Sequence, residues 1–154
     1  MGQIILFKLI LKKMKNIFLL GLFIGLFSCE KVDASGEIEV IKLVESSTSW
    51  NGDKLPSYPE KEPKLSILKF TIPPNTKMQM HKHLAINAGV LVKGELMVIS
   101  EYADTLFLKE GDPIVELYDT WHFGENLGSV PAEIIVFYAG EEGTPITILK
   151  NEEE

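Results

Sequence analysis

The fold is decided by two stretches of sequence, NTKMQMHKHLAINAGVLVKG at residues 75–94 and GDPIVELYDTWHFGEN at residues 111–126. Together they contain all three histidines of the 154-residue chain, His81, His83 and His122. Both stretches are rich in apolar and β-branched residues and contain turn-forming residues, which predicts short strands joined by turns. We therefore expect the histidines to be held on or beside strands.

His81 and His83 lie two residues apart in a strand predicted from Lys77 to His83. Alternate side chains of a strand share one face, so both imidazoles should point the same way, together with Gln79. The opposite face is expected to carry Met78, Met80 and Lys82. Two imidazoles on one face form a pair of ligands for Zn, Fe, Mn, Cu or Ni, and only His122 is left to supply a third.

The rest of the chain also predicts strands. Apolar runs of strand length alternate with turn residues, and no window beyond the first 28 residues offers a long, capped amphipathic helix. This pattern is typical of an all-β sandwich or barrel. The expected strands are Glu37–Val44, Leu65–Ile72, Lys77–His83, Gly89–Val92, Glu95–Glu101, Thr105–Leu108, Ile114–Tyr118 and Glu133–Tyr138.

The spacing around the first two histidines resembles the first motif of the cupin superfamily. That motif is Gly, five residues, His-x-His, three or four residues, Glu, six residues and Gly. This chain has the same intervals between Asn75, His81, His83, Asn87 and Gly94. Asn replaces the first glycine, and a second Asn replaces the glutamate.

The spacing around His122 resembles the second cupin motif, which is Gly, five residues, Pro-x-Gly, two residues, His, three residues and Asn. Here the matching positions are Gly111, Leu117, Asp119, His122 and Asn126. The replacement of turn glycines by Asn75 and Asp119 should matter little, because Asn and Asp are the residues that best tolerate a positive φ after glycine.

The resemblance implies a cupin-type double-stranded β-helix, a jelly-roll barrel, over residues 37–149. It also implies that His81, His83 and His122 bind one divalent transition metal, with Asn87 as a candidate fourth ligand. The chain looks like the small bacterial cupins described as quercetin-dioxygenase-like, which makes dioxygenase the favoured reaction class and leaves isomerase and hydrolase open. With Asn87 in place of glutamate, a divalent ion would keep a charge of +2 among its neutral ligands.

The N-terminus predicts an export signal. An eleven-residue apolar run, Ile17–Phe27, follows basic residues and is too short to span a membrane. Leu26-Phe27-Ser28-Cys29 resembles a bacterial lipobox, and lipidation would explain the sole cysteine, Cys29. We therefore expect a signal peptide over residues 1–28, with Met14 as an alternative start. A lipidated tether over 29–36 and an acidic tail over 150–154 complete the predicted organisation, which places the protein in the cell envelope.

Charge excludes one class of partner. The segment from Cys29 onward carries 11 lysines, no arginine and 22 acidic residues, a formal charge of −11. Such an acidic surface does not attract phosphate backbones, so nucleic acid is not an expected partner. A small molecule is expected instead, with a membrane contacted through the lipid anchor only and a homodimer left open.

Two function classes remain open. The first is a metal-dependent enzyme, for which Trp50 and Tyr138 are candidate substrate contacts, although aromatic residues in a barrel more often belong to the core. The second is a non-catalytic lipoprotein that binds a metal or a ligand. A pocket that admits an aromatic ring would favour the enzyme, whereas a barrel filled by Leu, Phe and Met would favour the binding module.

Overall fold

A computed structural model describes residues 36–151 of the chain. The predicted signal peptide, Cys29 and most of the tether lie outside the described residues. Residues 40–151 belong to one compact unit, which contains all of the described strands. No described helix is long and apolar enough to cross a membrane.

The described chain is all-β, as the alternation of apolar runs and turns predicts. Its strands are β1 (Pro63–Ile72), β2 (Thr76–Lys77), β3 (His81–Lys82), β4 (Ile86–Lys93), β5 (Glu95–Ser100), β6 (Thr105–Lys109), β7 (Pro113–Val115), β8 (His122–Asn126), β9 (Ala132–Glu141) and β10 (Ile148–Leu149).

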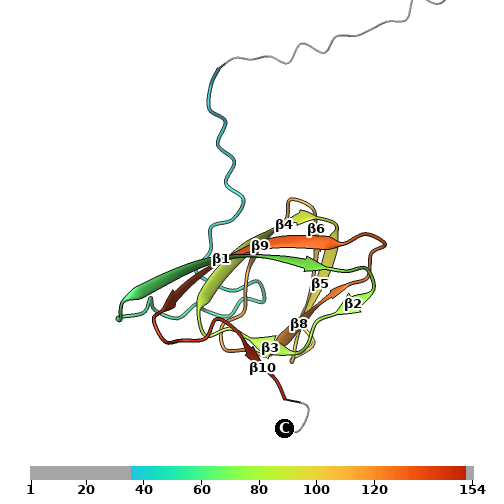
Figure 1. The fold of residues 1–154 in the computed structure, drawn as a ribbon. Coiled ribbons are helices and arrows are strands. Elements are labelled where there is room, and N and C mark those ends of the chain that lie inside the picture. The colour runs from blue at the N-terminus through green and yellow to red at the C-terminus, as the bar shows by residue number, and fades with distance from the viewer. Residues whose placement is uncertain (1–35, 152–154) are drawn as a thin grey trace, which may run out of the picture. The chain divides into compact units, whose positions relative to one another are not determined.

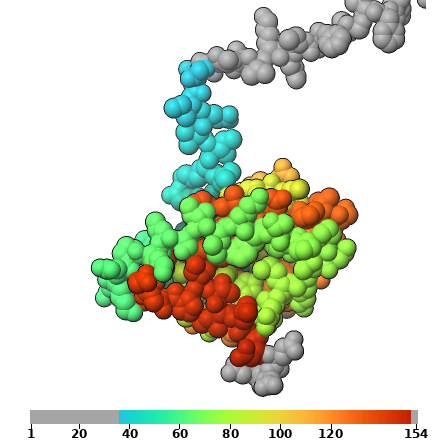
Figure 2. All heavy atoms as spheres, in the orientation of Figure 1, coloured from blue at the N-terminus to red at the C-terminus, as the bar shows by residue number. Residues whose placement is uncertain are grey.

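The strands form two antiparallel sheets (Figure 1). One sheet has four strands, which lie side by side in the order β1-β9-β4-β7. The other has six: five lie side by side in the order β10-β3-β8-β5-β6, and β2 pairs with β8. Strands far apart in the sequence become neighbours, as in the ten-residue ladder that joins β1 to β9. The C-terminal segment that contains β10 lies beside the segment that contains β3 (Figure 2).

The core lies between the sheets. In β4, β5 and β9 every second residue is buried, so one apolar face of each sheet is turned inward. The buried cluster draws on both sheets, and it comprises Ile72, Ala85, Leu91, Leu96, Val98, Leu108, Ile114, Ala132, Ile134, Val136 and Tyr138.

The turns explain why the motif tolerates its two exchanged glycines. Asn75 has φ 52° and Asp119 has φ 48°, both in the left-handed region that favours glycine. The expectation that Asn and Asp adopt a positive φ at these positions is confirmed. Gly94 has φ 77°, and a Cβ there would lie 2.8 Å from the carbonyl oxygen of Pro131, so this position admits no side chain.

The prediction of a strand over Glu37–Val44 is wrong. Residues 36–46 form no strand, and apolar side chains of this segment are exposed, with Ile38 at 91%. A β-branched sequence becomes a strand only where a neighbouring strand supplies hydrogen bonds and a packing surface. No described strand pairs with this segment.

The strand predicted over Lys77–His83 is broken into β2 and β3. Between them, Met78 still donates its backbone N–H to Gly124 O, at 2.8 Å, but residues 78–80 leave regular strand geometry. The break changes the alternation of side chains, so Met78 lines the interior cavity together with Gln79 and His81. The expectation that Met78 points to the opposite face is therefore wrong.

Candidate metal centre

The three histidines meet at one end of the six-stranded sheet. His81 in β3 is the direct cross-strand partner of His122 in β8, so their side chains lie on the same face. His83 follows β3 by one residue and shares the face of His81. The ring centroids are 4.5 Å apart for His81 and His122, and 5.1 Å apart for each of the other two pairs. One ring nitrogen of each histidine lies within 4.8 Å of the other two.

Backbone carbonyls fix which nitrogen of each ring carries the hydrogen. Nδ1 of His81 donates to Gln79 O at 2.8 Å, and Nδ1 of His122 donates to Thr120 O at 2.8 Å. Nδ1 of His83 donates to Ile146 O at 3.0 Å. A carbonyl oxygen can only accept, so each neutral ring keeps its hydrogen on Nδ1 and leaves the Nε2 lone pair free. Fixing the tautomer by such a partner is the usual way in which proteins prepare a histidine to bind a metal.

Burial keeps the three rings neutral. Desolvation lowers the pKa of His81 and of His122 below the ordinary value of 6.5, and it lowers that of His83 to about 3. The hydrogen bonds to the backbone carbonyls oppose this effect without overcoming it. Neutral imidazole is the form that binds metal ions, so the site needs no deprotonation at pH 7.

A buried carboxylate that the sequence analysis missed lies beside the histidines. Glu116 follows β7, is 9% exposed, and places Oε2 at 3.5 Å from Nε2 of His122. Burial raises its pKa to about 7, while the nearby His81 and a hydrogen bond from the Leu117 backbone act in the opposite direction. The sequence does contain one indication of its inward position. Glu116 lies two residues after the apolar Ile114, and alternate residues of a strand share one face, so both side chains should point the same way.

The contact between Glu116 and His122 fits a bound cation. Glu116 Oε2 and His122 Nε2 are both buried, and neither has a hydrogen-bond partner among the described residues. With the His122 hydrogen on Nδ1 and the carboxylate ionised, two lone pairs face each other at 3.5 Å. Buried polar atoms are rarely left in this state, and a proton or a metal ion near both of them would satisfy each lone pair. The donor set of three imidazoles and one carboxylate suits Zn, Fe, Mn, Cu or Ni.

Asn87, the fourth ligand suggested by the resemblance, is an inward residue of β4 and is 2% exposed. Its Nδ2 donates to Ala85 O at 3.2 Å, and its Oδ1 has no hydrogen-bond partner in the described part of the chain. It does not line the cavity beside the histidines, whereas Glu116 does. The carboxylate beside the histidines therefore comes from the residue that follows β7, and not from the position in β4 where the motif has glutamate.

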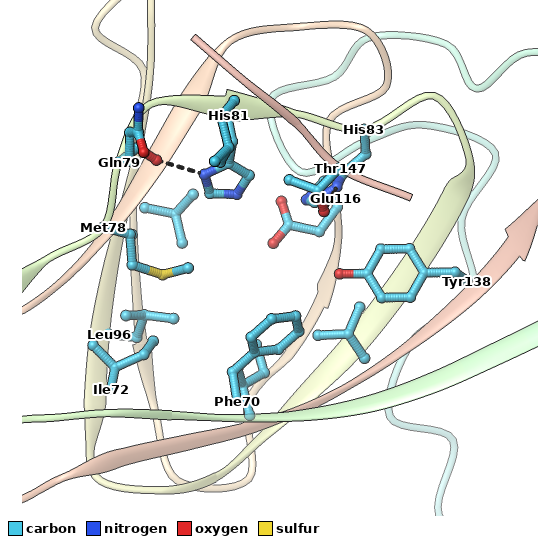
Figure 3. A pocket seen from close by; sticks show the side chains of 15 residues that line it. Phe70, Ile72, Met78, Gln79, His81, His83, Leu96, Glu116, Tyr138 and Thr147 are labelled. Atoms are coloured by element: carbon cyan, nitrogen blue, oxygen red, sulfur yellow. Dashed lines mark hydrogen bonds between the residues drawn. The ribbon is translucent and has the colours of Figure 1, made fainter. Parts of the chain in front are cut away.

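An interior cavity of about 300 Å³ opens beside the centre (Figure 3). Its polar side is formed by His81, His83 and Glu116, and His122 is not among the residues that line it. The remaining lining is mostly apolar, and it comprises Phe70, Ile72, Met78, Gln79, Leu96, Val98, Gly124, Ile134, Val136, Tyr138, Thr147 and Leu149.

The cavity has room for a small molecule. An engineered apolar cavity of about 150 Å³ is large enough to bind benzene, so this one admits an aromatic ring. Gly124 contributes to that room, because a Cβ on it would lie 3.2 Å from Met78 Sδ. Exposed Gln79, Thr147 and Leu149 line the side that faces solvent. The barrel is therefore not filled by its own side chains.

The two aromatic candidates for substrate contact have different positions. Tyr138 lines the cavity, with its ring 5.5 Å from that of His83 and its hydroxyl directed toward Glu116 and the interior (Figure 3). Burial, and secondly the charge of Glu116, raise the pKa of Tyr138, so its hydroxyl stays protonated. Trp50 packs against the hydrophobic core and does not line this cavity.

Comparison with known proteins gives a likeness to solved structures. No protein-family model and no curated protein matches the sequence. The DMSP lyase DddQ from Ruegeria pomeroyi DSS-3 matches with a TM-score of 0.52 and 20% identity over 58% of this chain and 45% of that one. A chain from the DMSP lyases RdDddP and RnDddQII matches with a TM-score of 0.50 and 18% identity, over 56% and 44%.

A smaller protein, an uncharacterized double-stranded β-helix protein from Klebsiella pneumoniae, matches with a TM-score of 0.49 and 18% identity, over 64% of this chain and 90% of that one. The match spans less than half the length of the two DMSP lyase chains. At these identities the likeness shows the fold alone. From its two antiparallel sheets and this likeness, the chain has a cupin-type double-stranded β-helix fold.

Proposed function

We propose that this protein is a metal-dependent cupin enzyme that acts on a small, largely apolar molecule. The observation that carries the proposal is the meeting of three neutral, tautomer-fixed imidazoles with a buried carboxylate at the wall of an apolar cavity. A binding site for a small molecule usually combines an apolar lining with a few polar groups that converge.

His81, His83 and His122 would hold the ion, and a divalent ion in that position supplies a Lewis acid that polarises a bound oxygen atom or lowers the pKa of bound water. The side chains on the other walls of the cavity would exclude water and orient the ligand. Apolar residues such as Phe70 and Val136 exclude water, which strengthens electrostatic interactions inside the cavity. The Tyr138 hydroxyl stays protonated and can donate a hydrogen bond to an oxygen atom of the ligand.

Dioxygenase is the reaction class that the cupin motif resemblance favours, and isomerase and hydrolase are the alternatives. A non-catalytic protein that binds a metal or a ligand is the second candidate function. The described cavity argues against a module that binds metal alone, because such a module needs no apolar space beside the ion. Turnover separates the enzyme from a ligand-binding module.

Turnover by protein loaded with a defined metal tests the enzyme proposal. Metal-free protein is reconstituted separately with Fe(II), Mn(II), Zn(II), Cu(II) and Ni(II), and each form is incubated with a panel of small hydroxylated aromatic and aliphatic compounds. Oxygen uptake and product masses are followed. We expect one metal to support turnover and the metal-free protein to show none. Retention of metal and compounds without chemical change in every form would instead establish the binding module.

We further propose that the protein acts in the cell envelope, anchored through acylated Cys29. The support is the sequence alone, with a short apolar run followed by Ser28-Cys29. Cys29→Ala should move the protein from the membrane fraction to the soluble periplasmic fraction, as measured by fractionation of the native host, while Ser28→Ala serves as the control. Unchanged membrane partition of Cys29→Ala would contradict the anchor.

A further inference from the structure

We propose that Glu116 supplies the anionic ligand of the three-histidine site, and that the carboxylate has moved by one strand, from position 87 in β4 to position 116 beyond β7. This inference rests on the proposed metal site and goes beyond it by assigning a ligand at position 116, where the second cupin motif specifies no residue type. Three observations on the described residues carry it.

The first observation is that positions 87 and 116 are neighbours across two paired strands. The antiparallel register of β4 and β7 pairs Ala88 with Val115 and Gly89 with Ile114. The pairing continues by one step, because Glu116 donates its backbone N–H to Asn87 O at 3.1 Å. Residues directly opposite each other in an antiparallel pair project from the same face, with Cβ atoms about 5 Å apart. Either position can therefore present a carboxylate to the same interior space.

The second observation is that no lysine among the described residues pairs with Glu116. Its side chain is almost fully buried, and among the described residues its only ion-pair partner is His122, which is neutral. No described lysine pairs with it, unlike Glu133 and Glu141 on β9. An ionised carboxylate buried without a cation destabilises a folded protein, so packing alone gives no reason for glutamate at this position.

The third observation is that two neighbouring buried atoms, one on Glu116 and one on His122, have no hydrogen-bond partner among the described residues. Glu116 Oε2 and His122 Nε2 are 3.5 Å apart, and each lacks a hydrogen-bond partner in the described residues. The group of possible ligand atoms that all lie within 4.8 Å of one another consists of His81, His83 and His122 and does not include Glu116. The carboxylate therefore lies next to this group and not within it. The 3.5 Å between Glu116 Oε2 and His122 Nε2 already places the carboxylate beside one of the three proposed ligands.

The proposal changes the charge of the site. With Asn87 as the only candidate fourth ligand, a divalent ion would retain a charge of +2, whereas the carboxylate of Glu116 lowers this to +1. The ion would then bind more tightly, and water bound to it would be less acidic than in a site with neutral ligands only.

Zinc titration of matched variants tests the proposal. The affinity for Zn(II) is measured calorimetrically at pH 7.5 for the full folded chain and for Glu116→Gln, Asn87→Glu/Glu116→Gln and Glu95→Gln. The last is a control, because it removes the same charge from an exposed position. We expect Glu116→Gln to weaken binding by about 10- to 100-fold, a range typical of losing one supporting group at a metal site. The control should stay within about twofold, and the double variant should recover most of the affinity.

A second readout reports on the ligand itself. Co(II) bound to the wild-type protein should show a visible absorption spectrum that changes in Glu116→Gln, because the set of donor atoms changes. The proposal is overturned if Glu116→Gln binds Zn(II) like the wild type, and equally if the double variant binds as weakly as Glu116→Gln. In both cases the proposed function stands as long as His122→Ala loses metal. Unchanged binding in both His122→Ala and Glu116→Gln would instead remove the metal site.

Discussion

Replacement of His122 by alanine is expected to lower the affinity for Zn(II) by more than about 100-fold, since even the loss of a ligand's hydrogen-bonding partner costs 10- to 100-fold. His122 is one of three imidazoles whose free nitrogens lie together, and it is also the ring nearest to Glu116. Without it, His81 and His83 are the only imidazoles that remain, and Glu116 loses the ring that it contacts. Isothermal titration with Zn(II) measures the effect.

The control for this variant must separate metal binding from folding, because His122 is 1% exposed and its removal leaves a hole. His122→Gln keeps most of the volume and should lose metal to a similar extent. Circular dichroism of both variants should match that of the wild type. Folded variants that bind Zn(II) with wild-type affinity would show that the histidines are packing residues.

Metal-free Glu116→Gln is expected to be more stable than the metal-free wild type above pH 7. The pKa of Glu116 is raised from 4.5 to about 7 in the folded protein, mainly by burial. Between these values the folded state holds a proton that the unfolded state has lost, so the contribution of Glu116 to stability falls as the pH rises through this window. Glutamine has no proton to lose, and the difference should reach at most about 3 kcal/mol at pH 8.

Urea unfolding in the presence of a chelator, at pH 4.5 and at pH 8, measures this difference. His81, His83 and His122 act in the opposite direction, because their pKa values are lowered and their contribution to stability is lost as the pH falls below 6.5. That contribution is common to both proteins and should largely cancel in the comparison. An equal gain in stability at both pH values would show that the pKa of Glu116 is the same in the folded and the unfolded metal-free protein.

The sequence was sufficient to predict that the three histidines converge, partly from a local rule and partly from the resemblance to the cupin motifs. The alternation of side chains puts His81 and His83 on one face, and the cupin intervals bring in His122. The left-handed turns at Asn75 and Asp119 were predictable for the same reason, since φ preferences belong to single residues.

Features that depend on strand pairing could not be predicted in the same way. Glu116 lies beside the three histidines because β7 pairs with β4, and the residues around Glu116 do not predict which strand β7 pairs with. The break at residues 78–80, which turns Met78 inward, comes from how the segment pairs with β8. β10, with two residues, is too short for any periodicity to appear. Residues 37–44 have a strand-like composition but no partner strand in the described chain.

Metal analysis of the wild-type protein purified from its own cell envelope, without added metal or chelator, tests the central claim most directly. Plasma emission spectrometry, combined with quantitative amino-acid analysis, gives the number of ions per chain. The convergence of His81, His83 and His122 predicts one divalent transition-metal ion per chain, which a chelator removes and which a single metal restores to the same ratio. Protein that contains no transition metal, and that takes up none at micromolar concentration while folded, would contradict the account.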